Sequence, residues 1–387
     1  MHTEDRHHRN KVRVPLPRTI DESYDIEIGE DLFDQIPRDL RANILPGASR
    51  IAIITDGAVR LRYGERILVR LRSEGIDAAI FDFAPGEKHK TRETKAALED
   101  ALIASRFGRD SGVIALGGGV VSDLAGFVAG TFARGIPFLI YSTTVLGAAD
   151  ASVGGKTAVD TPVATNLIGL FHQPRKVYID TATWGTLPPA EIRNGLAETV
   201  KHACLGDHGF FEYLEQHLDQ LLPAVTNGGA IDPAVATHIA VKNCEIKSCI
   251  VAADVHETNF RQVLNLGHTL GRALEPLANF SLSHGEAVAI GLVFQLRLGK
   301  RFGYVTGEEV ARVEGLIARI GLPTRIPATI SAAPIVEKMH TDKKARRDVI
   351  RFVFQESIGK MVRFPDGNWS RAVAEDELVT ALVESYS

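Results

Sequence analysis

In the segment Gly112-Val-Ile-Ala-Leu-Gly-Gly-Gly-Val-Val-Ser-Asp123, three glycines separate an apolar run from the start of a helical pattern. The apolar run, Gly112–Leu116, predicts a buried β-strand, and Val120–Phe132 has the period of a helix. Glycines join the two segments. At such a junction they let backbone N–H groups approach a phosphate, and the helix N-terminus adds partial positive charge. The junction is therefore either a dinucleotide-binding loop or a tight turn without a ligand.

The segments on either side repeat this alternation of strand and helix. Ser23–Gly29 alternates polar and apolar residues, which predicts a half-exposed edge strand. Strands that alternate with helices predict a parallel sheet covered on both faces. Apolar strands are expected at 50–55, 76–83 and 138–141, with helices at 59–73 and 91–107.

The pattern changes near Leu187-Pro188-Pro189. Beyond this point the periodicity is almost entirely helical, and one late strand is expected at Val349–Phe354. We therefore expect an N-terminal tail at 1–20, an α/β domain at 21–187 and a mostly helical domain at 188–387. The expected helices lie at 190–204, 210–222, 234–251, 263–277, 285–302 and 307–320.

Composition narrows the class of protein. The chain has 387 residues, 45% of them hydrophobic and 24% charged, which is ordinary for a globular protein of two domains. A formal net charge of −4 argues against nucleic-acid binding. Cysteine occurs only 3 times, which excludes a disulfide framework and favours a cytoplasmic location. No apolar run is long enough to span a membrane, and we expect no signal peptide.

A dense polar cluster follows the glycine loop. Asp150, Lys156 and Asn166 lie among residues that otherwise look buried. Burying charged groups is costly unless they pair with one another or bind a ligand. The cluster is therefore either a buried Asp150–Lys156 ion pair or an anion site with donors on Lys156 and Asn166. The glycines before Lys156 favour the anion site, because they leave space for a ligand.

Three residues of the second half are candidate metal ligands. Glu198, His268 and His284 together offer a carboxylate and two imidazoles, which is the open three-ligand set of catalytic zinc. Their spacing alone is not a zinc signature. Each histidine, taken by itself, is equally compatible with a hydrogen-bonded residue of a helix.

Taken together, the motifs resemble the 3-dehydroquinate synthase family of sugar-phosphate cyclases. The resemblance runs from about Ser23 to the end of the chain and implies an NAD-binding, Rossmann-like domain at 21–187. It further implies a metal- and substrate-binding helical domain at 188–387 and a homodimer. The motifs, in the family's order and spacing, are Gly117-Gly-Gly-x-x-x-Asp123, Arg134-Gly135, Thr143-Thr144, Asp150-Ala-Ser-Val-Gly-Gly-Lys156, Asn166-Leu-Ile-Gly169, Gly195-Leu-Ala-Glu198-x-x-Lys201, Leu264-Asn-Leu-Gly-His268 and His284-Gly-Glu-Ala-Val288.

The resemblance also implies roles for single residues. Glu198, His268 and His284 match the ligands of a zinc or cobalt ion. Catalytic positions are matched by Asp150, Lys156, Lys201, Glu257 and Asn265. Substrate-binding positions are matched by Arg134, Asn166, Lys247, Arg261, Arg272, Lys343 and Lys344, and Arg134 is expected to reach the neighbouring subunit. Positions that contact NAD are matched by Asp56, Glu87, Lys90, Gly118, Gly119, Asp123, Thr143 and Thr144.

The implied reaction converts a carboxylate-bearing heptulosonate 7-phosphate to 3-dehydroquinate and phosphate. It proceeds by transient oxidation with NAD, elimination of phosphate, return of the hydride and an intramolecular aldol step. Lys156, Asn166, Arg272 and Arg134 would hold the phosphate. Lys247 and Arg261 would hold the carboxylate, because the fork of an arginine suits bidentate contact.

The chain departs from the family pattern at Arg272, where a histidine is usual, at Thr165, where lysine is usual, and at Ala58, where asparagine is common. An arginine retains a hydrogen-bond donor but cannot move a proton near pH 7. The other reading of Arg272 is a surface pair with Glu275 or Glu286.

Alternatives therefore remain for the function. A related cyclase would act on an amino analogue of the substrate or on sedoheptulose 7-phosphate. A metal-dependent NAD(P) polyol dehydrogenase and a non-catalytic sensor are further alternatives.

Overall fold

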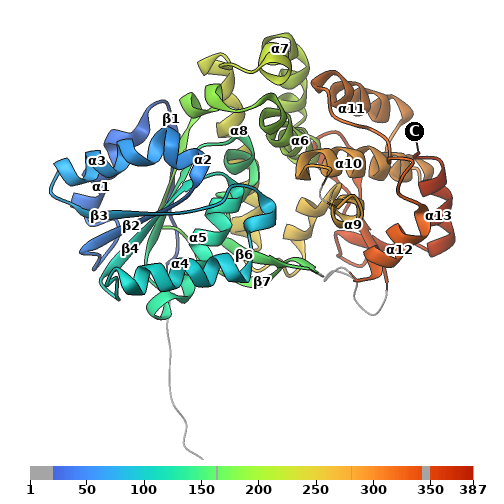
Figure 1. The fold of residues 1–387 in the computed structure, drawn as a ribbon. Helices are drawn as coiled ribbons and strands as arrows, with labels where there is room; N and C mark the ends of the chain where they lie inside the picture. Colours follow the sequence, from blue (N-terminus) through green and yellow to red (C-terminus); the bar gives the residue numbers. More distant parts are fainter. Residues whose placement is uncertain (1–20, 163, 280, 342–348, 387) are drawn as a thin grey trace, which may run out of the picture.

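The computed structural model describes residues 21–162, 164–279, 281–341 and 349–386. The expected N-terminal tail and the two candidate lysines Lys343 and Lys344 lie outside the described residues. Two halves are visible in Figure 1, a sheet half coloured mainly blue to green and a helical half that runs from green through yellow to red.

A six-stranded parallel sheet with strand order β1-β8-β5-β4-β2-β3 forms the sheet half. Every residue of the central strand β4 is buried, as expected for a parallel sheet covered on both faces. The predicted edge strand is confirmed. The strands are β1 (Asp25–Gly29), β2 (Arg50–Asp56), β3 (Asp77–Phe83), β4 (Ser111–Gly117), β5 (Phe138–Ser142) and β8 (Lys176–Asp180).

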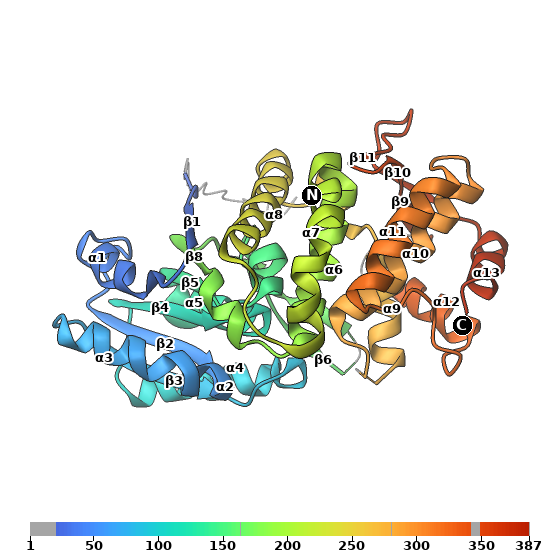
Figure 2. The same ribbon diagram turned by 90° about the horizontal axis from the view of Figure 1, so that it is seen from above.

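Helices cover the two faces because side chains alternate along each strand. Along β2, Ile51 and Ile53 pack with α1 (Gln35–Arg41) and α3 (Glu65–Ser73), whereas Ala52 and Ile54 face the opposite core. That opposite core includes residues of α4 (Arg92–Ala104) and α5 (Gly119–Thr131). Figure 1 shows the sheet between these layers, with α1 and α3 above it and α4 below it, and Figure 2 looks down onto them from above. Short helical segments complete the half: η1 (Leu32–Asp34), α2 (Gly57–Val59), η2 (Arg60–Gly64), η3 (Glu87–His89), η4 (Phe132–Arg134) and η5 (Gly147–Ala151).

An antiparallel hairpin that the sequence did not predict lies between β5 and β8 in the chain. Its strands are β6 (Lys156–Thr161) and β7 (Ala164–Phe171). The hairpin packs on α5, where a Cβ on Gly126 would lie 2.5 Å from Thr157 Cγ2. Its first residue, Lys156, thereby reaches the boundary between the two halves.

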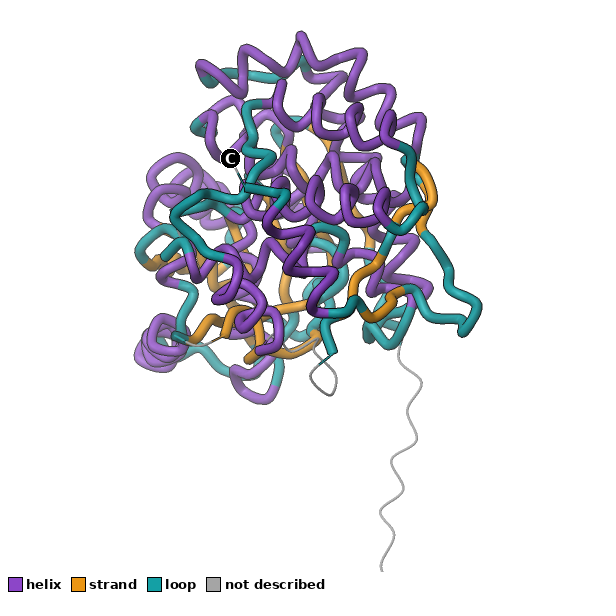
Figure 3. Tube along the Cα trace, turned by 90° about the vertical axis from the view of Figure 1, so that its right-hand side faces the viewer, coloured by secondary structure: helices purple, strands orange, loops and turns teal. Residues whose placement is uncertain are grey.

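Figure 3 looks onto the helical half, which agrees with most of the predicted periodicity. The helix expected at 263–277 is interrupted at Leu266 and Gly267, because Gly267 adopts a left-handed conformation before the helix that begins at His268. The helices at Ala332–Thr341 and Glu375–Val383 were not predicted.

The central helix of this half, α6, is buried along most of its length. None of the described helices is long and apolar enough to cross a membrane. The helices are α6 (Pro189–Gly206), α7 (His208–Asn227), α8 (Pro233–Ala253), α9 (His268–Leu277), α10 (His284–Arg301), α11 (Gly307–Ile320), α12 (Ala332–Thr341) and α13 (Glu375–Val383), with η6 (Thr181–Thr186) and η7 (Phe260–Asn265) before α6 and α9. Short strands follow at β9 (Arg351–Val353), β10 (Gln355–Ser357), β11 (Lys360–Met361) and β12 (Ser370–Ala372).

One hydrophobic core extends through both halves. The same cluster of buried side chains contains Val113 of β4, Val128 of α5, Val200 of α6 and Leu292 of α10. The fold class predicted from the sequence, a Rossmann-like parallel sheet followed by a helical region, is confirmed. The predicted boundary at residue 187 lies between η6 and α6 and stays a proposal.

Candidate active site

A cavity of about 860 Å³ lies between the two halves. Its walls come from α5 and the β6–β7 hairpin on one side, and from α6, α8, α9 and β9 on the other. The predicted site residues that line it are Asp123, Asp150, Lys156, Asn166, Lys201, Lys247, Glu257, Arg261, Asn265, His268 and Arg272. The fold thus collects residues that are far apart in the sequence.

Positive charge dominates the cavity wall. The carboxylates along the wall are Asp123, Asp150 and Glu257. The cations are Lys156, Lys201, Lys247, Arg261, Arg272 and Arg351. A cleft lined mainly by one sign of charge concentrates ligands of the opposite sign. The cavity therefore suits a small molecule with more than one negative charge.

Lys156 and Asp150 do not pair with each other, which excludes the ion-pair alternative for this polar cluster. Lys156 pairs with Glu257, and Asp150 Oδ1 accepts a hydrogen bond from Lys247 Nζ at 2.6 Å. Burial lowers the pKa of Lys156 to about 8, with Arg261 and Arg272 acting in the same direction and Glu257 against it. Lys156 therefore loses its charge just above neutral pH.

The two glycines before Lys156 make room for protein side chains. A Cβ on Gly154 would lie 2.3 Å from Arg261 Nη2, and one on Gly155 would lie 2.4 Å from Gln173 Oε1. The expectation that they clear space for a ligand is therefore corrected, since Arg261 and Gln173 fill that space. Arg261 is buried and donates to Gly154 O at 3.2 Å.

Arg272 pairs with neither of the carboxylates proposed for it. Glu275 Oε1 lies 2.6 Å from His284 Nδ1, and Glu286 accepts a hydrogen bond from Ser283 at the start of α10. Within the described part of the chain, Arg272 Nη1 is buried without a hydrogen-bond partner. The guanidinium lines the cavity and is available to an anion there.

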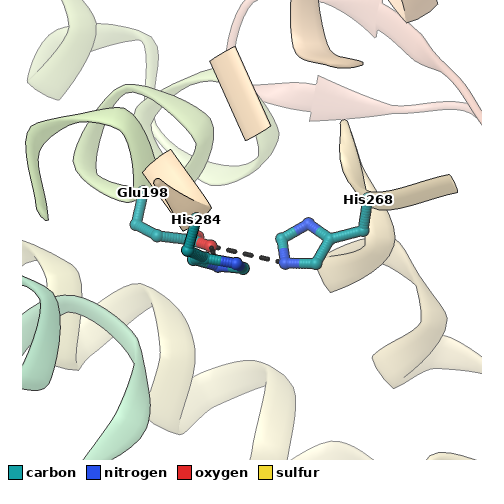
Figure 4. A group of neighbouring side chains, drawn as sticks. All are labelled: Glu198, His268 and His284. Atoms are coloured by element: carbon teal, nitrogen blue, oxygen red, sulfur yellow. Dashed lines mark hydrogen bonds and ion pairs between the residues drawn. The ribbon is translucent and has the colours of Figure 1, made fainter. Parts of the chain in front are cut away.

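The three candidate metal ligands converge, as Figure 4 shows. Glu198 Oε1 lies 3.0 Å from His284 Nε2 and 3.4 Å from His268 Nε2. Burial favours a neutral Glu198, yet Lys201 and the two histidines hold its pKa well below the usual value. Burial and Lys201 lower the pKa of His268 to about 4. Burial also acts to lower the pKa of His284, but Glu275 and Glu198 raise it overall to about 10, so a metal ion would displace a proton from this imidazole. A charged carboxylate and a neutral imidazole are the forms that bind a metal ion.

Close helix contacts bring these ligands together. His268 and His284 are the first residues of α9 and α10, whereas Glu198 lies within α6. A Cβ on Gly285 would lie 2.4 Å from Asn194 O of α6, so α10 begins in backbone contact with α6. Only glycine permits this approach.

A second group of possible ligands, Asp150, Glu198 and His202, shares Glu198 with the first. Here both carboxylates already have ammonium partners, because Asp150 pairs with Lys247 and Glu198 Oε2 pairs with Lys201. A metal ion at this position would meet both lysines. The geometry therefore favours Glu198, His268 and His284 as the metal site.

Residues predicted to contact NAD lie at the carboxyl edge of the sheet, where open α/β sheets bind ligands. Asp56 ends β2, Gly118 follows β4, and Thr143 follows β5. Gly119 is the first residue of α5, and Thr144 Oγ1 accepts a hydrogen bond from Gly147 N at 2.9 Å.

A buried lysine lies next to this edge. Lys90 pairs with Glu87 and, at 3.3 Å, with Asp123. Burial raises the pKa of Asp123 to about 6, although Lys90 opposes the shift. Arg134, by contrast, is exposed at the end of η4 and does not line the cavity of this subunit.

Sequence reasoning missed three residues of the site. Asp160 Oδ1 accepts a hydrogen bond from the Asn166 backbone N–H at 2.7 Å, and Arg351 of β9 lines the cavity. Glu275 contacts His284. Asp160 belongs to the polar cluster around Asn166, so its neighbourhood was a usable signal. Arg351 and Glu275 carried no comparable local signal.

Comparison with known proteins agrees with the resemblance. Residues 80–194 match the family model described as 3-dehydroquinate synthase N-terminal, and residues 195–345 match the one described as 3-dehydroquinate synthase C-terminal. A 3-dehydroquinate synthase from Pelobacter propionicus is 42% identical over 341 residues, which cover 88% of this chain and 92% of the relative.

Two solved structures share the fold. ValA, the 2-epi-5-epi-valiolone synthase from Streptomyces hygroscopicus subsp. jinggangensis 5008 with NAD+ and Zn2+ bound, has a TM-score of 0.84 at 26% identity and covers 96% of this chain and 99% of its own. A 2-deoxy-scyllo-inosose synthase complexed with carbaglucose-6-phosphate, NAD+ and Co2+ has a TM-score of 0.81 at 24% identity and covers 93% and 96%. This chain belongs to the 3-dehydroquinate synthase family.

Proposed function

We propose that this chain converts a heptulosonate 7-phosphate with a free carboxylate to 3-dehydroquinate and phosphate. Its family makes it a phosphate-eliminating carbon–oxygen lyase. The observation that carries the substrate assignment is the cation-rich cavity next to the candidate metal ligands. A substrate with a phosphate at one end and a carboxylate at the other needs cations in two places, and the cavity offers both.

The phosphate would lie between the β6–β7 hairpin and α9. Lys156 and Asn166 approach from the hairpin, and Arg272 approaches from α9. The buried, unpartnered Arg272 Nη1 supports this placement. A guanidinium and an ammonium that hold the phosphate also fix its oxygens next to the C–H bond that must lose a proton, which is a gain from positioning.

The carboxylate would lie near Lys247 and Arg261. Both side chains are almost fully buried and line the cavity. Lys247 is already held by Asp150, and Arg261 Nε is buried without a partner among the described residues. Desolvated donors of this kind bind an anion strongly, because no water competes for them.

Two cofactors complete the proposal, NAD and a divalent zinc or cobalt ion, which are the cofactors of the two solved structures described above. Glu198, His268 and His284 would hold the metal, and the residues at the carboxyl edge of the sheet would hold NAD. When bound, NAD would take up and return a hydride, and the metal would polarise the reacting oxygen. Lys201, paired with Glu198, would keep that carboxylate charged and in place.

We further propose a cytoplasmic homodimer in which Arg134 reaches the phosphate of the neighbouring subunit. The exposed position of Arg134 outside its own cavity supports this role. Lys343 or Lys344 remains a candidate for the phosphate end.

The decisive experiment is product analysis by NMR with the heptulosonate 7-phosphate, its amino analogue and sedoheptulose 7-phosphate. We expect 3-dehydroquinate and phosphate in equal amounts from the first substrate, with NAD needed only in catalytic amounts. Steady accumulation of NADH in step with turnover would refute the cyclase assignment and favour a dehydrogenase.

A further inference from the structure

Glu275 makes a short contact to one of the candidate metal ligands. Its Oε1 lies 2.6 Å from His284 Nδ1, on the side of the imidazole ring that faces away from Glu198. An ionised carboxylate has no hydrogen to donate, so it can only accept a hydrogen bond from an imidazole N–H. His284 Nδ1 therefore carries a hydrogen, and Nε2 is the nitrogen that faces Glu198.

The second histidine is oriented in the same sense but by a different partner. His268 Nδ1 lies 3.1 Å from the backbone carbonyl of Leu266, which also only accepts. Both Nε2 atoms thus point to Glu198 Oε1, at 3.0 Å for His284 and 3.4 Å for His268. The orientation of His268 depends on the main chain, whereas that of His284 depends on a side chain that a substitution can remove.

The helix that carries Glu275 has little freedom to move. A Cβ on Gly271 of α9 would lie 2.9 Å from Ala287 O of α10, and one on Gly291 of α10 would lie 1.9 Å from Gly267 O. The two helices therefore meet at backbone contact. Glu275 follows His268 by seven residues, two helical turns, so both lie on one face of α9.

We propose that Glu275 is a positioning residue that holds His284 with Nε2 directed at the metal ion. The proposal rests on the metal site proposed above. A carboxylate behind a ligating imidazole fixes the ring and increases its basicity, and losing such a partner typically weakens metal binding about 10–100-fold. Glu275 would act through His284 and not on the substrate.

The test is the affinity of the metal-free protein for Co²⁺, measured by competition with a chromophoric chelator, together with the visible spectrum of the bound ion. We expect Glu275→Ala to weaken Co²⁺ binding about 10–100-fold. Glu275→Gln should weaken it less, because the amide oxygen still accepts from Nδ1–H but lacks the charge. A changed visible spectrum in both variants would report altered ligand geometry.

Glu286→Gln is the matched control, because Glu286 lies near His284 in sequence but accepts from Ser283. It should bind Co²⁺ as the wild type does. Wild-type affinity and spectrum in both Glu275 variants would overturn the positioning role, and so would lower thermal stability with unchanged affinity. If Glu275→Ala does not fold, Glu275→Gln decides. A wild-type protein that binds no Co²⁺ would instead refute the metal site itself.

Discussion

The two halves of the molecule place their candidate site residues by different means. In the sheet half, Asp56 ends a strand, and Gly118 and Thr143 directly follow strands, so the order of the parallel sheet already puts them at one edge. In the helical half, Glu198 and His284 come from separate helices that meet at glycine contacts. The position of a residue at a strand end follows from the order of the strands in the sheet. The neighbours of a residue in a helix depend instead on how the helices pack.

The two halves should therefore differ in how much activity a single substitution removes. In the sheet half, the order of the strands places much of the site. The helical half depends on single side chains, each with one or two charged partners. Substitutions there should therefore cost more activity.

The largest effect is expected from Glu198→Gln. An amide in place of the buried carboxylate removes the negative ligand and leaves Lys201 without its partner. Since a metal ion contributes several kcal/mol of charge stabilisation, kcat/KM should fall by about 10³-fold. Metal content measured on the same preparation should fall with it. Retention of both activity and metal would contradict the ligand assignment.

The second largest effect is expected from Arg272→Ala. Its kcat/KM should be about 10–100-fold lower, because a charge-assisted hydrogen bond contributes about 1.5–3 kcal/mol. Steady-state kinetics should show a higher KM together with a lower kcat, since the clamped phosphate also takes part in proton removal. Arg272→His should recover much of the rate. Unchanged kinetics in Arg272→Ala would exclude the phosphate clamp.

A smaller effect is expected in the sheet half. Asp123→Asn removes a buried charge that pairs with Lys90, and Lys90 keeps Glu87 as a partner. The affinity for NAD, measured by titration calorimetry, should fall about tenfold, and metal content should not change. Asp82→Asn, at a surface pair with Arg60, is the control and should bind NAD normally. Loss of metal from Asp123→Asn would contradict the expectation that this substitution weakens NAD binding alone.

The smallest effect concerns pH. The pKa of Lys156 is lowered to about 8 by burial, so its ammonium charge is present at pH 7 and is lost as pH rises through that value. The KM for the phosphate substrate should therefore rise about fourfold between pH 7 and pH 8.5. Lys156→Arg should show no such rise over this range, because its guanidinium stays charged. An equal rise in both proteins would assign the titration to another group.

The strands and most helices were predictable, because each shows its period locally. The β6–β7 hairpin was not, since polar residues within its strands, such as Asp160 and Asn166, interrupt the apolar alternation. The site was predictable from the sequence only as a set of motifs.

The sequence did not allow us to predict which charged side chains of the site form ion pairs with one another. Lys156 pairs with Glu257, 101 residues away, and Lys247 pairs with Asp150, 97 residues away. These ion pairs depend on which side chains the tertiary fold brings within contact distance. The Asp150–Lys156 pair, which was the alternative to an anion site, joined residues that are close in sequence but are not partners in space.

The continuous core described above has a consequence for how the molecule can be taken apart. Val113 and Val128 share one apolar cluster with Val200 and Leu292. Cutting the chain near residue 187 would expose the matching surfaces of both pieces to water. Heating should give a single calorimetric transition, and recombination with a relative at this boundary should yield folded chimaeras only when the shared apolar surface is transferred as well.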